Sequence, residues 1–124
     1  MIRSFKSVVL ASKDPDRLAA FYRDALGLPI EPELHRGTER HWAGMVGAQH
    51  FAIHPLEGFW LPTDAQRSFV SFDVDSVPAA LDALAPHGVE VVARTRIGPM
   101  AFVALRDPDG AVVCLGERWP DTTR

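Results

Sequence analysis

The chain presents the same order of structural signals twice within its 124 residues. In each half, an apolar stretch precedes a helix N-cap residue, an amphipathic stretch and a helix-ending glycine, and three short apolar runs follow. Shifting the first half by about 62 positions places Leu10 on Phe72 and Asp14 on Ser76. Such a period favours an α+β chain built from two strand–helix–three-strand units, or βαβββ modules. A coincidental likeness of two halves is the alternative.

The first half is predicted to begin with a strand over residues 5–12, where β-branched and apolar side chains dominate. Asp14 and Pro15 then provide an N-cap and a first helical residue, and Gly27 ends the helix. The other elements predicted in this half are an extended piece over 28–31, a polar loop over 33–38 and strands over 40–46 and 50–54.

Residues 57–66 have no periodicity, so they are predicted to link a module at 1–56 to a module at 67–124, within one domain of two repeats. In the second module a strand is predicted before a helix that Ser76 caps and Gly88 ends. The strands predicted in this module cover 69–74, 89–95, 100–105 and 111–115.

The sequence Asp107-Pro108-Asp109-Gly110 separates the last two apolar runs. Asp-Pro and Asp-Gly favour a tight turn, because proline presets φ and glycine accepts a positive φ. The sequence therefore predicts a hairpin of the last two strands. Simple pairing across this turn puts Val103 opposite Cys114 and leaves open which face of the sheet Phe102 lies on.

The composition excludes several classes of function. The net charge is −3 and the basic residues are scattered, so neither nucleic acid nor an anionic membrane surface is an expected partner. No apolar run approaches the roughly 20 residues that span a bilayer. The N-terminus has no signal-peptide pattern, and the single cysteine cannot form an intramolecular disulfide. A cytoplasmic location is therefore expected.

Two stretches carry a family resemblance, AFYRDALGL at residues 20–28 and RDPDG at residues 106–110. At this separation they resemble the vicinal oxygen chelate superfamily of glyoxalase I, bleomycin-resistance proteins and extradiol dioxygenases. The resemblance extends over nearly the whole chain. It implies two βαβββ modules with pseudo-twofold symmetry, in which concave mixed sheets enclose a cavity and one helix packs on each convex face. It also implies a homodimer.

Enzymes of this superfamily hold a divalent metal in the cavity, through ligands from the first and fourth strands of each module. Carried over one position at a time, these ligand positions fall on Ser7, Ala52, Phe69 and Cys114. Alanine and phenylalanine cannot coordinate a metal, serine is a poor ligand, and a lone cysteine does not hold an ion unaided. We therefore expect no metal at the usual positions and no cofactor.

A metal site built from histidines near these positions is an alternative. His50 and His54 share a strand face with Ala52, but residues four apart on a strand lie roughly 13 Å apart and cannot easily share one ion. His50 with His41 of the neighbouring strand is a further pair, although the turn would place His50 nearer Gly44 or Val46. The alternatives are a hydrogen-bonding wall residue and a metal-free acid–base role, for which His50 is a weak catalytic candidate.

Aromatic residues and the cysteine have two interpretations each. Trp42, Phe69 and Phe102 are either core residues or stacking walls of the cavity. Cys114 is expected to be an inert buried thiol rather than a nucleophile, since no neighbouring base is evident. Asp73 is either a cavity-edge group or a solvated carboxylate at a strand end.

Two functions of different classes follow, and whether the protein is an enzyme stays open. The first is a metal-free protein that binds a small organic molecule in the inter-module cavity, as bleomycin-resistance proteins do. The second is a metal-dependent lyase, isomerase or dioxygenase with non-standard ligands such as His50. A cavity filled by its own side chains is a third reading. The predicted ligand-binding residues are Ser7, Trp42, His50, Ala52, His54, Phe69, Phe102 and Cys114.

Overall fold

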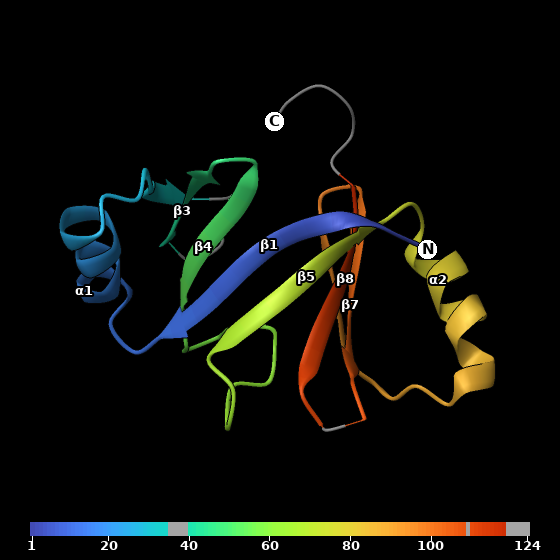
Figure 1. Ribbon diagram of the computed structural model, residues 1–124. Coiled ribbons are helices and arrows are strands. Elements are labelled where there is room, and N and C mark those ends of the chain that lie inside the picture. Colours follow the sequence, from blue (N-terminus) through green and yellow to red (C-terminus); the bar gives the residue numbers. More distant parts are fainter. Residues whose placement is uncertain (35–39, 109, 119–124) are drawn as a thin grey trace. The chain divides into compact units, whose positions relative to one another are not determined.

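The computed structural model describes residues 1–34, 40–108 and 110–118, which form eight strands and two α-helices. Hydrogen bonding orders the strands as β2-β3-β4-β1-β5-β8-β7-β6, a mixed sheet (Figure 1). The predicted α+β class is therefore confirmed. The strands are β1 (Ile2–Ser12), β2 (Glu31–Leu34), β3 (Arg40–Val46), β4 (Gln49–Pro55), β5 (Ser68–Val74), β6 (Val91–Ile97), β7 (Met100–Arg106) and β8 (Val112–Glu117).

The chain divides into two compact units, and each is described by itself. The α1 unit contains Ser7–Phe59 and Thr63–Phe69. The α2 unit contains Met1–Lys6, Trp60–Pro62 and the residues from Val70 on. The predicted module boundaries at 56 and 67 stay a prediction. None of the helices in the described ranges has the length and apolar character of a membrane span.

The α1 unit is organised by local signals that the sequence carries. The Asp14 carboxylate accepts a hydrogen bond of 3.1 Å from the Arg17 amide, which caps helix α1 (Pro15–Ala20) as predicted. A π turn, η1 (Phe21–Ala25), continues the helix, and Gly27 has a φ of 77°. The core between helix and sheet is formed by Ala19, Ile30, Trp42 and Ile53.

The edge strand β2 corrects the predicted loop over 33–38. Glu33 and Leu34 are paired with His41 and Arg40 of β3, so this polar segment is extended rather than looped. An edge strand tolerates polar side chains because one of its sides faces solvent, which explains why hydropathy missed it. The rest of the predicted loop, residues 35–38, lies outside the described residues.

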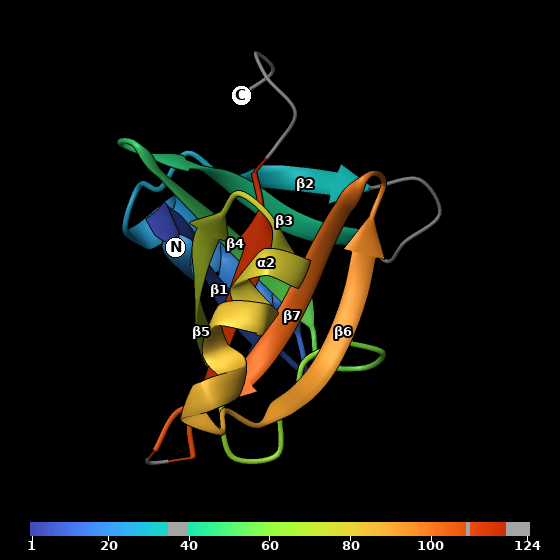
Figure 2. The ribbon, with the colours of Figure 1, turned by 90° about the vertical axis from the view of Figure 1, so that its right-hand side faces the viewer.

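The α2 unit repeats the arrangement. The Ser76 hydroxyl accepts a hydrogen bond from the Ala79 amide and caps α2 (Val77–Leu84), as predicted. A 3-10 turn, η2 (Ala85–His87), follows and ends at Gly88. Figure 2 shows α2 lying over the strands of this unit. The core on this side is formed by Val74, Val77, Ala80, Val103, Leu105 and Leu115.

Strand β6 lies two residues further along the chain than the predicted 89–95. Its pairing with β7 continues to Ile97 opposite Met100, so the strand runs up to the turn at Gly98. Gly98 has a φ of 58°, a left-handed conformation that closes a short hairpin turn.

The β7–β8 hairpin corrects a predicted register. The Asp107 amide donates to the Ala111 carbonyl at 2.8 Å, and the Ala111 amide donates to Asp107 Oδ1 at 2.9 Å, so Ala111 belongs to the turn. Cys114 consequently pairs with Ala104, and not with Val103. Because a one-residue change moves every side chain to the other face, Phe102 lies on the face of Cys114. Asp109 lies outside the described residues.

The Glu117 carboxylate joins α2 to the sheet. Oε2 accepts from the Val77 amide at 3.0 Å, at the first residue of α2, and Oε1 accepts from the Ala101 amide at 2.9 Å on β7. The Ala101 and Val77 hydrogen bonds lower the pKa of Glu117 below its usual 4.5, because they favour the charged form. One side chain thus satisfies two backbone donors.

Glu117→Gln is expected to lower the free energy of unfolding at pH 7 by about 1–2 kcal/mol, since an amide has one acceptor oxygen where the carboxylate has two. Because the pKa of Glu117 is lower in the folded state, the carboxylate contributes fully to the free energy of unfolding above the unfolded-state pKa. This contribution is lost as the pH falls through the folded-state pKa. The difference between the two proteins in urea unfolding should therefore shrink as the pH falls below about 4.5. An equal difference at every pH would contradict this account.

Candidate functional site

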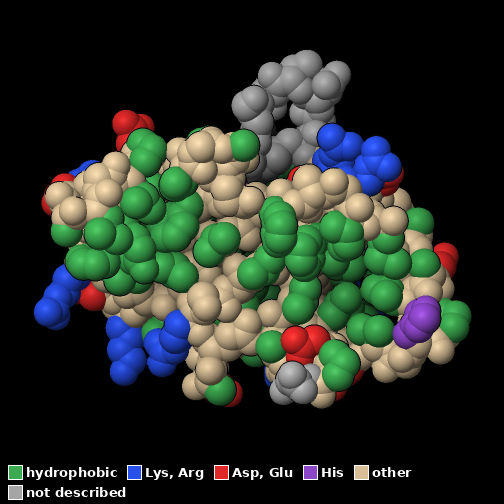
Figure 3. Space-filling view, viewed as in Figure 1, with side chains coloured by type: hydrophobic (Ala, Val, Ile, Leu, Met, Phe, Trp, Pro, Cys, Tyr) green, Lys and Arg blue, Asp and Glu red, His purple; other side chains and the backbone are tan. Residues whose placement is uncertain are grey.

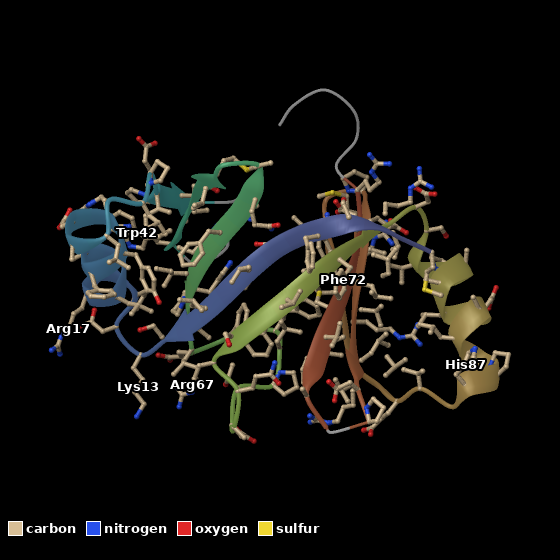
Figure 4. The ribbon with its side chains drawn as sticks, viewed as in Figure 1. Lys13, Arg17, Trp42, Arg67, Phe72 and His87 are labelled. Atoms are coloured by element: carbon tan, nitrogen blue, oxygen red, sulfur yellow. The ribbon has the colours of Figure 1, made fainter. Side chains whose placement is uncertain are left out.

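In each unit one face of the sheet packs on the helix, and the opposite face carries most of the predicted site residues. Trp42 is the exception. It packs with Ile53 and Ala19 on the helix side, and its indole Nε1 donates to Asp16 Oδ1 at 2.7 Å. Figure 4 shows Trp42 beside α1. The structure therefore does not bring Trp42 together with His50, because side chains of neighbouring positions alternate between the faces of a strand.

The α1 unit has a face rich in histidine, which we call the histidine face (Ser7, His41, His50, Ala52, His54, Phe59 and Phe69). Ser7 Oγ and His50 Nδ1 are 2.8 Å apart, a hydrogen bond between β1 and β4. Ser7, Ala52 and Phe69 are buried, so three of the four superfamily ligand positions lie in the interior of this unit.

Aromatic rings form a continuous row on the histidine face. The His41 and His54 rings are stacked with centroids 4.2 Å apart and planes 7° apart. Phe59 contacts His54 at 5.2 Å and Phe69 at 5.7 Å. His41 thus pairs with His54, whereas His50 lies opposite Met45. This register agrees with the expectation that His50 and His41 are not cross-strand partners.

The α2 unit has a second such face, which we call the lysine face (Lys6, Trp60, Ser71, Asp73, Met100, Phe102, Cys114 and Gly116). Phe102, Met100 and Cys114 form a buried cluster against which Trp60 packs. Burial raises the pKa of the Cys114 thiol to about 11, against smaller opposing effects of the Ser71 hydroxyl and the Lys6 charge. The thiol is therefore protonated at neutral pH.

Lys6 is the site residue that sequence reasoning missed. Its side chain is 7% exposed, and its ammonium lies 2.6 Å from Asp73 Oδ1. Nζ also donates to the Glu117 carbonyl at 3.0 Å and lies 5.5 Å from the centroid of the Phe102 ring. The other Asp73 oxygen accepts from Ser4 Oγ at 2.7 Å. Asp73 is thus an ion-paired group rather than a solvated carboxylate.

Gly116 gives the space that Lys6 occupies. A Cβ at this position would lie 2.5 Å from the Phe102 ring and 2.6 Å from Lys6 Cε. A glycine inside a strand often marks such a close approach, so Gly116 is the signal in the sequence that could have pointed to the cluster.

The side chains at the superfamily ligand positions do not fit a divalent metal. Ala52 and Phe69 offer no donor atom, the Ser7 hydroxyl bonds to His50, and Cys114 would be a lone thiolate ligand. Across residues 1–34, 40–108 and 110–118, the structure contains no group of three His, Cys, Asp or Glu side chains arranged to hold a metal.

Comparisons with known proteins agree with this fold. An uncharacterized protein of Escherichia coli K12, YaeR, is 28% identical over 109 residues, which are 80% of this chain and 84% of that protein. The structure of methylmalonyl-CoA epimerase from Mycobacterium tuberculosis superposes with a TM-score of 0.72 at 20% identity, over 96% of this chain and 90% of that chain.

A second solved structure is a glyoxalase/bleomycin resistance protein/dioxygenase superfamily member from Vibrio splendidus 12B01. Its TM-score is 0.62 at 14% identity, over 95% of this chain and all of the other. The model of the glyoxalase-like domain matches residues 7–116. The resemblance drawn from the two sequence stretches is therefore confirmed, and the chain belongs to the glyoxalase-like domain family.

Proposed function

We propose that this protein binds a small organic molecule without a metal at the usual superfamily positions. The observation that carries the proposal is the chemistry of Ser7, Ala52, Phe69 and Cys114, which leaves no set of metal ligands at those positions. A binding function needs no catalytic residue, so the loss of these ligands does not count against it. The ligand would lie in the predicted inter-module cavity.

The histidine face and the lysine face suggest which kind of molecule is bound. The histidine face offers a row of flat rings with one hydrogen-bonded serine–histidine pair. The lysine face offers an apolar cluster beside a charged pair. Such a lining, mostly apolar with few polar groups, suits a small and partly planar organic molecule. His54, Phe69 and Phe102 are the stacking residues of this proposal.

An enzyme of the same superfamily is the second candidate. The likeness to methylmalonyl-CoA epimerase and the Ser7–His50 hydrogen bond favour it, because that bond orients the His50 ring. Such an enzyme would be a metal-dependent lyase, isomerase or dioxygenase that uses His50 as a non-standard ligand. A homodimer and a cytoplasmic location stay predictions for either function.

Metal binding separates the two candidates. Protein purified without chelator and titrated with Ni²⁺, Zn²⁺, Fe²⁺ or Mn²⁺ is expected to bind less than one equivalent in elemental analysis and calorimetry. Tight binding of one equivalent that is lost in His50→Ala would overturn the metal-free proposal and favour the enzyme.

Ligand binding is measured by a thermal-shift screen of small aromatic and aliphatic compounds. A compound present at 100 times its Kd stabilises the folded protein by about 2.7 kcal/mol, which is a readily measured shift. Hits should weaken in Phe102→Ala and persist in His87→Ala, a control at an exposed histidine that follows α2 (Figure 4). In the same view, Figure 3 shows histidine at the surface over α2. A screen with no hit would favour a cavity filled by its own side chains.

The thiol of Cys114 is expected to be unreactive in the folded protein. Its pKa of about 11, compared with an ordinary value of 9.0, leaves about a hundredfold less thiolate at pH 8. Labelling with a chromogenic disulfide reagent should therefore be at least that much slower in the native protein than in urea. Rapid labelling of the native protein would restore Cys114 as a candidate nucleophile.

A further inference from the structure

The lysine face holds a buried ammonium, Lys6, whose side chain is 7% exposed and whose Nζ lies 2.6 Å from Asp73 Oδ1. The Ser71 hydroxyl is buried on the same face. We propose that the Lys6 ammonium, together with the Ser71 hydroxyl, binds a carboxylate of the small-molecule ligand. This inference rests on the proposed binding function and names its ligand class.

The Lys6 ammonium has more N–H donors than oxygen partners among the described residues. An ammonium has three N–H donors, and within the described residues Nζ has two oxygen partners, an ion pair with Asp73 Oδ1 and a hydrogen bond to the Glu117 carbonyl. The Phe102 ring lies on another side of the ammonium, at 5.5 Å from Nζ to the centroid. A buried ammonium N–H without an acceptor gains a strong, charge-assisted hydrogen bond when a ligand oxygen accepts from it.

Ser71 supplies a second donor on the same face. The residue is 4% exposed, and its hydroxyl has no oxygen or nitrogen partner within the described part of the chain. Ser71 stands two residues before Asp73 on β5 and pairs with Cys114 of β8, so its side chain shares their face. The Cys114 sulfur, a weak acceptor, lies near this hydroxyl, and a ligand oxygen would give it a stronger hydrogen bond.

Two donors in an apolar surrounding match the two oxygens of a carboxylate. Asp73 offsets the charge of Lys6, and it therefore limits how tightly an anion is held. Removing the Asp73 carboxylate while keeping Lys6 should therefore increase the affinity for a carboxylate ligand. If the Lys6–Asp73 ion pair were only structural, this change would not increase the affinity. A side chain at Gly116 would collide with Lys6 and Phe102, so the glycine permits this placement of Lys6.

The test compares acids with their isosteric amides on the purified chain. The probes are benzoate against benzamide, phenylacetate against phenylacetamide and propionate against propionamide, measured by calorimetry or ligand-observed NMR at low salt. At least one acid should bind about tenfold more tightly than its amide, as expected for one charge-assisted hydrogen bond. Asp73→Asn should increase the affinity for that acid. The double variant Lys6→Met/Asp73→Asn should abolish the preference, and it leaves no unpaired buried charge.

Controls separate this inference from folding effects and from the proposed function. Lys13→Met removes an exposed lysine (Figure 4) and should leave the preference unchanged. Circular dichroism and urea unfolding check that each variant is folded. If compounds of the screen bind but every acid binds no better than its amide, the Lys6 proposal is overturned and the binding function stands. A preference that persists in the double variant also overturns it. If no compound binds at all, both proposals fall.

Discussion

The alternation of side chains between the two faces of each strand is the constraint on which this structure depends. In each unit one face is packed on a helix, so every strand residue is assigned either to that core or to the opposite face. Val103 and Leu115 belong to the helix side, whereas Phe102 and Cys114 belong to the other side. The hairpin turn sets this assignment, because one residue more or less would exchange the two groups.

That same alternation gives the histidine face and the lysine face their chemistry. Lys6 and Ser7 are neighbours on β1, yet they belong to different units and bond to different partners, Asp73 and His50. Each unit thus places a polar pair among buried apolar or aromatic side chains. These pairs place a charged group on the lysine face and a hydrogen-bonded group on the histidine face.

Short-range signals predicted most of the fold, since a cap or a turn depends on residues close in sequence. Asp14 and Ser76 cap their helices as expected, because the bonds that they make reach only three residues ahead. The side of Phe102 could not be predicted, because it depends on whether Ala111 joins the turn or the strand. The ion pair of Lys6 and Asp73 could not be predicted either, because it depends on tertiary contacts between residues distant in sequence.

The hydrogen bond from Lys6 to the Glu117 carbonyl joins residues 111 positions apart. During synthesis, the strand that carries Lys6 is made among the first residues, and it lacks this partner until β8 has been translated. The lysine must therefore stay hydrated on the ribosome while the α1 unit already has all of its residues. Contacts of such separation are slow to form, so the lysine face should be among the last parts of the protein to be completed.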